Sequence, residues 1–242
     1  MNKPLNICVF QHIACEHPGS FRDFAAAEGI TLSPVELDEG EAIPELGQFD
    51  GLWVMGGPMD VWEEQQFPWL IEEKLAIREA IRRKLPFLGF CLGHQLLASA
   101  LDGDVGVAAQ PEVGIEKIAL TENGKASPFL SGTPNTQNVL QWHSAAVLHA
   151  PQDAVVLARS PACEIQAMSI GDHALSMKYH VELIETTVKD WNEVPAYRES
   201  LEKSLGPAGA VAFENDTATH LGEMHQQAQR LFANWCATVF SK

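Results

Sequence analysis

A cysteine flanked by glycines constrains this chain more than any other feature: Cys91 lies two residues after Gly89 and two before Gly93. An apolar run over 86–90 predicts a buried strand, and a helical pattern over 92–101 follows with almost no linker. A strand-to-helix turn this sharp needs small neighbours, because the backbone must fold tightly beneath the middle side chain. The stretch therefore predicts a nucleophile elbow, with Cys91 in a strained and exposed position at the end of a strand.

A catalytic role for Cys91 requires more than this turn. The N-terminus of the following helix offers unpaired N–H groups and the positive end of the helix dipole, which favour a thiolate. A free cysteine is also often a small buried core residue. The elbow thus leaves a catalytic and a structural interpretation open, and the partners of the thiol must decide between them.

Charge and composition exclude several classes of protein. The 242 residues include 32 acidic and 16 basic side chains, for a formal net charge of −16, which argues against a surface that binds nucleic acid or an anionic membrane. No apolar run approaches the roughly 20 residues that span a bilayer, and no signal peptide is visible. Five cysteines without close-spaced pairs fit a reducing compartment. We expect a cytoplasmic protein with no nucleic-acid partner and no membrane partner.

Strand and helix patterns alternate through the first hundred residues. Strands are predicted over 5–10, 31–37, 51–55 and 86–90, and helices over 20–27, 69–84 and 92–101. This alternation predicts an α/β fold with a doubly wound, mostly parallel sheet and helices on both faces. Gly57 and Cys91 both follow strands of this sheet, at the edge where ligands gather.

The second half of the chain has a different pattern. Short runs between turn residues predict an added antiparallel β segment, over 104–109, 113–120, 137–142, 154–159, 165–170 and 174–177. Residues 184–205 are predicted to be helical with an interruption at Pro195, and a last helix is predicted from Thr217 or Thr219 to about Val239. We expect a single domain over 1–242, with a core of about 5–190 and a C-terminal helical extension of about 191–242.

A nucleophilic cysteine needs a base, and the base needs a group that orients it. Among the nine histidines, His180 is the best candidate, because it lies between a β-run and a helix and Glu182 follows two residues later. Alternate side chains of an extended backbone share a face, so Glu182 is placed to orient the imidazole. The alternative is a loop histidine beside a surface glutamate.

The other histidines are weaker candidates. His94 is expected to support the elbow, His143 to line a pocket, His173 to sit at a hairpin tip, and His220 and His225 to be surface or packing residues of the last helix. The residues His12, Cys15 and His17 do not complete a four-ligand metal set. We therefore expect no metal and no cofactor.

The elbow sequence Gly-Phe-Cys-Leu-Gly-His-Gln-Leu-Leu-Ala, followed much later by Tyr-His-Val-Glu, resembles the class I, triad-type glutamine amidotransferases. The segment Gly-Gly-Pro-Met at 56–59 is similar to the oxyanion strand of the branch that includes the glutaminase domain of GMP synthase, and 111–114 and 142–144 also fall where that branch has like motifs. The resemblance spans about residues 5 to 190.

The resemblance implies a role for each matching residue. Cys91 would attack the side-chain amide of glutamine and form a γ-glutamyl thioester, with His180 as base and Glu182 orienting it. The backbone N–H groups of Gly57 and Leu92 would form the oxyanion hole. The substrate's amino-acid end would be held by Gln95, Ser144 and Ala145.

The sequence departs from the family at two points. The family usually has His-Pro-Glu, and here Val181 replaces the proline; we expect the pair to survive with slightly altered orientation. No phosphate-binding loop or synthase segment follows, so any ammonia acceptor is expected on a separate synthetase subunit. Two alternatives stay open: a free-standing γ-glutamyl peptide or amide hydrolase with the same triad, and a catalytically idle regulatory or binding homologue. The oligomeric state is not predicted.

Overall fold

The computed structural model describes residues 4–206 and 208–240. Its centre is a nine-stranded sheet with the order β2-β1-β3-β4-β9-β8-β7-β5-β6. The strands are β1 Asn6–Gln11, β2 Thr31–Glu36, β3 Gly51–Val54, β4 Phe87–Phe90, β5 Asp104–Leu120, β6 Thr136–His149, β7 Ala154–Arg159, β8 Ala167–Ile170 and β9 Ala174–Met177. The helices are α1 Phe21–Ala27, α2 Trp69–Arg82, α3 Leu92–Ala100, α4 Glu122–Ala126, α5 Thr187–Asn192, α6 Pro195–Leu205 and α7 Gly209–Phe240, with short 3-10 turns η1 Leu46–Gln48 and η2 Pro128–Leu130.

The sheet has a parallel half and an antiparallel half. Strands β2, β1, β3, β4 and β9 are parallel neighbours, whereas β9, β8, β7, β5 and β6 pair antiparallel. The predicted doubly wound core and added antiparallel segment are confirmed. The prediction was wrong for β9, which was assigned to the antiparallel segment alone but also pairs in parallel with β4. This pairing matters because it sets the residues after β9 beside the end of β4.

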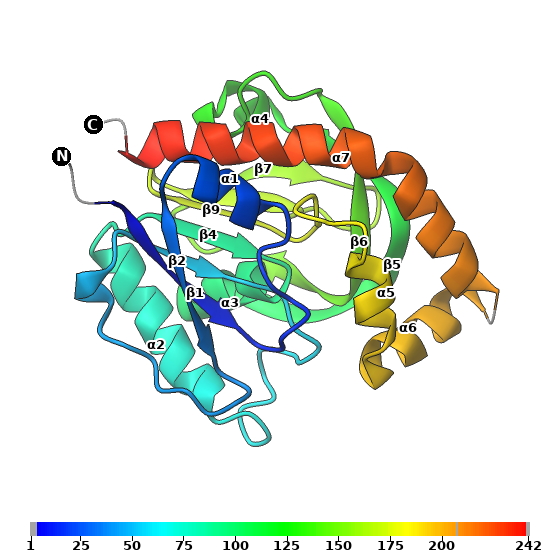
Figure 1. The fold of residues 1–242 in the computed structure, drawn as a ribbon, viewed down its shortest axis with the longest axis horizontal. Helices are drawn as coiled ribbons and strands as arrows, with labels where there is room; N and C mark the ends of the chain where they lie inside the picture. Colours follow the sequence, from blue (N-terminus) through cyan, green and yellow to red (C-terminus); the bar gives the residue numbers. More distant parts are fainter. Residues whose placement is uncertain (1–3, 207, 241–242) are drawn as a thin grey trace.

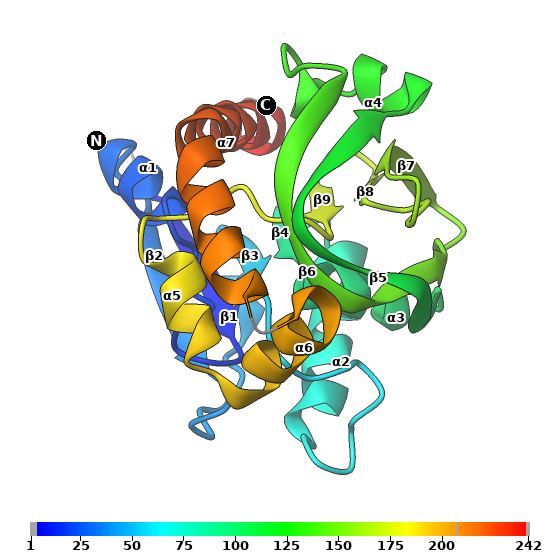
Figure 2. The same cartoon turned by 90° about the vertical axis from the view of Figure 1, so that its right-hand side faces the viewer.

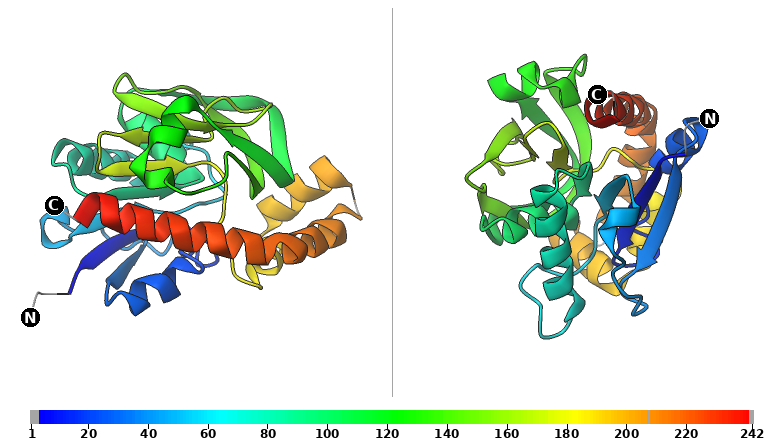
Figure 3. Two further views of the ribbon diagram at one scale, coloured as in Figure 1. Left: turned by 90° about the horizontal axis from the view of Figure 1, so that it is seen from above. Right: turned by 90° about the vertical axis from the view of Figure 1, so that its left-hand side faces the viewer.

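Helices cover both faces of the parallel half, as predicted. Successive strand residues point to opposite faces, so Ile7 and Val9 of β1 pack with α1 and α7, while Cys8 and Phe10 pack with α2 and α3. Figure 1 and the left view of Figure 3 show α7 running along the molecule over the first of these faces. Trp235 anchors α7 there, since its indole N–H donates to the carbonyl of Phe87 at 3.0 Å.

The last helix is longer than predicted. It begins at Gly209 rather than Thr217 or Thr219, because Phe213 packs into a third apolar cluster with Trp142 of β6 and Trp191 and Tyr197 of α5 and α6. Figure 2 shows β5 and β6 as a curved two-stranded ribbon with α6 at its lower end. This cluster holds α6 over the ends of β3 and β4. No helix in the described part of the chain is both long and apolar enough to cross a membrane.

Candidate active site

The elbow is built as the glycines predict. Cys91 has a φ of 49° and a ψ of −101°, a strained conformation for a residue with a side chain. A methyl group on Gly93 would lie 2.1 Å from the carbonyl oxygen of Val54, and one on Gly89 would lie 2.9 Å from the carbonyl oxygen of Gly93. Only glycine therefore allows the helix to start so close to the neighbouring strand.

The Cys91 side chain is buried, which corrects the prediction of an exposed thiol. Cys91 is 7 % exposed and lies in a small cavity of about 110 Å³. The cover comes from α6, which contributes Ala196, Tyr197 and Ser200 to the wall. The helical extension thus takes part in the site, and the sequence analysis did not foresee this.

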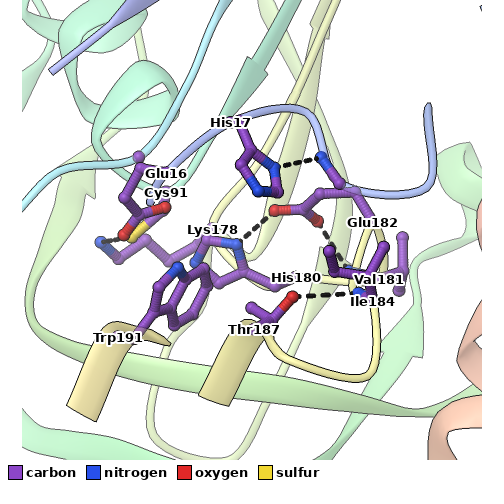
Figure 4. Close-up of polar contacts among 12 residues, drawn as sticks. Glu16, His17, Cys91, Lys178, His180, Val181, Glu182, Ile184, Thr187 and Trp191 are labelled. Carbon is purple, nitrogen blue, oxygen red and sulfur yellow. Dashed lines mark hydrogen bonds and ion pairs between the residues drawn. The ribbon is translucent and has the colours of Figure 1, made fainter. Parts of the chain in front are cut away.

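His180 and Glu182 lie together behind the thiol, in the arrangement drawn in Figure 4. Nδ1 of His180 is 2.5 Å from Oε1 of Glu182. The edge of His180 packs on Trp191 of α5, with ring centroids 4.7 Å apart. Backbone bonds between His180 and Leu140 of β6, at 2.9 and 3.2 Å, fix the segment. The imidazole is therefore held by a carboxylate, an indole and a strand.

Val181 adds a hydrogen bond that proline would lack. Its backbone N–H donates to Oε2 of Glu182 at 2.9 Å, whereas proline has no N–H to donate. Both carboxylate oxygens of Glu182 are thus engaged, one by His180 and one by Val181. The departure from His-Pro-Glu is compatible with a well-oriented pair.

The charges around the thiol favour its ionised form. Burial raises the pKa of Cys91, but the Lys178 charge and a hydrogen bond with His180 outweigh burial and bring this pKa below the ordinary value. Burial lowers the pKa of His180, but Glu182 and the contact with Cys91 raise it well above its ordinary value. Together these shifts favour a thiolate–imidazolium pair.

The pKa values of the other four thiols are shifted in the opposite direction. Burial raises the pKa of Cys8 to about 12, of Cys15 to about 11 and of Cys236 to about 12, and it also raises the pKa of Cys163. Cys91 is therefore distinguished by its neighbours and not by burial as such.

Two backbone N–H groups are unpaired near the thiol. Among the described residues, neither Gly57 nor Leu92 has an acceptor for its backbone N–H; Leu92 is the first residue of α3, where no helical partner exists. Gly57 lines the cavity with Cys91. The loop that carries Gly57 is fixed on two sides, because Gly93 N–H donates to Met55 O at 3.0 Å and Nδ1 of His12 lies 2.7 Å from Gly56 O.

The three predicted substrate contacts are in the same cavity. Gln95, Ser144 and Ala145 all line it, Gln95 from the first turns of α3 and the other two from β6. The structure thus brings all eight predicted site residues together. Gly57, Cys91, Gln95, Ser144 and Ala145 line the cavity, Leu92 follows Cys91 directly in the chain, and His180 and Glu182 lie behind the thiol.

Comparison with known proteins identifies the family of this chain. The family model described as "Glutamine amidotransferase class-I" matches residues 24–191. The chain belongs to the class I glutamine amidotransferase family. Its confirmed fold and this membership agree with the resemblance seen in the sequence.

Individual relatives differ in activity. The chain is 31 % identical over 191 residues to GMP synthase of Aeropyrum pernix, a match that covers 72 % of this chain but only 35 % of that protein. It is 34 % identical to a glutamine-hydrolysing GMP synthase subunit of Saccharolobus solfataricus (60 % of this chain, 73 % of that one). It is also 27 % identical to gamma-glutamyl peptidase 3 of Arabidopsis thaliana (74 % of each chain).

A solved structure matches the chain over nearly its whole length. The glutamine amidotransferase of Methylobacillus flagellatus is 30 % identical and superposes with a TM-score of 0.85, over 98 % of this chain and 95 % of that one. The α5–α7 extension is therefore within the region that the two amidotransferase structures share.

The sequence analysis missed three residues of this candidate site. The buried side chain of Lys178 has Nζ 3.4 Å from Sγ of Cys91. Glu16, from the loop after β1, accepts a hydrogen bond from the Tyr197 hydroxyl of α6, and its charge acts on the Cys91 thiol. Alternation back from Glu182 through His180 places Lys178 on the same face, so a signal for it was present in the sequence.

The first loop holds no metal cluster. Within the described residues, no group of three or more His, Cys, Asp or Glu side chains is arranged to bind a metal ion. His12 is instead bonded to Gly56 and, at 2.9 Å, to Glu73 of α2, and His17 accepts from the N–H of Gly19 at 3.1 Å.

Four other histidines lie close to the positions that the sequence predicts for them. His94 is fully buried, bonded to Ser176 Oγ at 2.8 Å and to Ile165 O at 3.1 Å, which fits the expected support of the elbow. His143 lines the cavity and lies 3.3 Å from Glu112. His173 is in the β8–β9 turn, and His225 of α7 packs on Phe24.

Proposed function

We propose that the protein is a cysteine-nucleophile amidohydrolase that releases ammonia from the side chain of glutamine. The observation that carries this proposal is the buried Cys91 at the elbow, beside a His180–Glu182 pair joined at 2.5 Å. A lowered thiol pKa and a raised imidazole pKa are the charge states that such chemistry needs.

The proposed reaction has two steps. Sγ of Cys91 attacks the amide carbon of glutamine; the C–S bond forms, the C–N bond breaks, and His180 gives its proton to the departing ammonia. Water then attacks the γ-glutamyl thioester, with His180 accepting a proton, and glutamate leaves as the thiolate re-forms. The tetrahedral oxyanion of each step would accept bonds from the N–H groups of Gly57 and Leu92.

The proposed acceptor of the ammonia lies on a separate synthetase subunit. Support comes from the Saccharolobus solfataricus relative, which is named as one subunit of a GMP synthase and of which this chain covers 73 %. The proposed role of Gln95, Ser144 and Ala145 is to hold the amino and carboxylate groups of glutamine, since these residues line the cavity next to Cys91.

The test is labelling with a glutamine-derived chloroketone and measurement of glutamate release. We expect one adduct, mapped to Cys91, and loss of both label and turnover in Cys91→Ala. Cys163→Ala serves as the matched control, because this buried thiol has a raised pKa and lies outside the cavity lining; it should keep label and turnover. A protein that stays unlabelled while folded would refute the proposal.

A second candidate function is hydrolysis of a larger γ-glutamyl compound, and a specific feature favours it. An outer cavity of about 790 Å³ adjoins the catalytic one and shares Ser144, Ala196 and Ser200 with it. Such a volume exceeds what the departure of ammonia requires and offers room for a bulky leaving amine. A relative named gamma-glutamyl peptidase is consistent with this candidate.

Substrate comparison separates the two functions. Ser204 lines the outer cavity and not the catalytic one, so Ser204→Trp should obstruct a bulky leaving group. If the second function holds, γ-glutamyl amides turn over faster than glutamine, and Ser204→Trp slows them at least about tenfold while glutamine hydrolysis is retained. If glutamine is the better substrate and Ser204→Trp changes nothing, the outer cavity has no part in the reaction.

A further inference from the structure

Lys178 is a buried cation in direct contact with the nucleophile. It follows β9, and the residue is 2 % exposed. The Met177 carbonyl accepts from the N–H of Cys91 at 2.9 Å, so the two backbones are locked side by side. Nζ of Lys178 lies 3.4 Å from Sγ of Cys91, and Figure 4 draws both side chains.

The surroundings of Lys178 give its charge no other close partner. Among the described residues, no carboxylate lies within 4.0 Å of this ammonium. The two nearby imidazoles are kept neutral: burial lowers the pKa of His94 to about 3 and of His143 to about 4, and the Lys178 charge acts in the same direction. A buried ammonium is costly unless an anion compensates it. The thiolate of Cys91 is the anion in contact.

The other groups that face Cys91 divide into two kinds. His180 supports the thiolate through a hydrogen bond, whereas the buried Glu16 carboxylate opposes it. Asp60, His143 and Tyr197 face the same cavity from the loop after β3, from β6 and from α6. Lys178 and His180 thus both offset Glu16 at the sulfur.

We propose that Lys178 is a catalytic residue that holds Cys91 as a thiolate through direct contact with Sγ. This rests on the proposed role of Cys91 as nucleophile. Acylation of the sulfur removes the negative charge and leaves the Lys178 ammonium without its anion. Lys178 therefore also stabilises the sulfur as it leaves the thioester, when water attacks and the thiolate re-forms.

The test is the pH dependence of alkylation by iodoacetamide, resolved by peptide mapping at Cys91. This reagent needs no glutamine, so the outcome is independent of the substrate. We expect Lys178→Met to raise the midpoint of Cys91 alkylation by about one pH unit or more, which is a tenfold slower reaction below that midpoint. Lys178→Arg should keep most of the lowered midpoint. Lys125→Met, which removes an exposed ammonium, is the control and should leave it unchanged.

An unchanged midpoint in folded Lys178→Met would overturn the proposal. If that variant does not fold, the native protein supplies a second measurement. Linkage is reciprocal, so capping Cys91 with a neutral carboxamidomethyl group must lower the titration midpoint of one lysine, followed by NMR of its Cε resonance. If no lysine resonance changes its midpoint on capping, Lys178 and Cys91 are not coupled and the proposal fails.

Discussion

Two of the buried His–Glu pairs, His12–Glu73 and His180–Glu182, can be compared directly, and only the second lies beside a thiol. His12 and Glu73 are 2.9 Å apart, and His180 and Glu182 are 2.5 Å apart. In both pairs burial lowers the histidine pKa and the glutamate reverses this, so both histidine pKa values are raised. By distance, burial and charge the two pairs are alike.

The second ring nitrogen makes the difference. Nδ1 of His12 faces the carbonyl oxygen of Gly56 while Nε2 faces Glu73. Two acceptors on one ring require both nitrogens to be protonated, so His12 has no nitrogen free for a thiol proton. Glu182 takes Nδ1 of His180 and leaves the other nitrogen for Cys91. A buried His–Glu pair is thus not a catalytic pair until its third partner is known.

Replacing each histidine is the strongest test of this comparison. We expect His180→Gln to lower kcat/KM for the best substrate about 10³-fold, because general acid–base catalysis is lost. This variant should also lower Tm, because it leaves the buried Glu182 without its partner. His12→Gln should lower Tm and reduce the activity of the folded protein far less. Steady-state kinetics and thermal unfolding measure both effects. Equal losses of rate in the two variants would mean that the pairs do not differ in role.

The second largest effect is expected on stability, when the His12–Glu73 pair is broken. Glu73→Gln leaves His12 without its carboxylate in a fully buried site, and we expect the free energy of unfolding in urea to fall by about 3 kcal/mol. Glu79→Gln is a matched control on the same helix, since Glu79 forms an exposed pair with Arg82; it should cause no measurable change. Equal stability of the two variants would contradict a structural role for the His12 pair.

The smallest expected effect is on the pH dependence of the protein's stability. A histidine whose pKa is raised on folding contributes stability that is fully present below its unfolded pKa of about 6.5 and is lost as pH rises through its folded pKa. The stability difference between the native protein and Glu73→Gln should therefore be largest near pH 6 and shrink at alkaline pH. His180 titrates in both proteins, so its contribution to stability cancels in the difference. Urea unfolding at a series of pH values measures this, and a difference that grows with pH has the wrong sign.

Much of this architecture was predictable because it is encoded locally. Apolar runs gave the strands β1 to β4, and the flanking glycines gave the elbow, whose steric need is visible in the contacts of Gly89 and Gly93. The pair His180–Glu182 followed from strand alternation. These features depend on residues close in sequence.

What the sequence analysis missed depends on contacts between distant residues. The parallel pairing of β9 with β4 and the early start of α7 at Gly209, which the packing of Phe213 supports, follow from tertiary contacts. The burial of Cys91 comes from α6, more than a hundred residues later. Lys178 lies two residues before His180 and therefore on the same face of an extended backbone. A lysine ammonium is usually exposed, however, and only the fold shows that this one is buried.

The double anchoring of residues 55–57 has a consequence for how the site works. Gly93 holds the carbonyl of Met55, and His12 holds that of Gly56, so the elbow, the loop and α2 form one rigid unit around the Gly57 N–H. The conformational entropy of ordering this donor is lost once, during folding, and not again in each cycle of the proposed reaction. Structures with the cavity empty and with Cys91 acylated should therefore superpose closely at Gly57. We expect the motion that admits substrate to occur in α6, which covers the cavity.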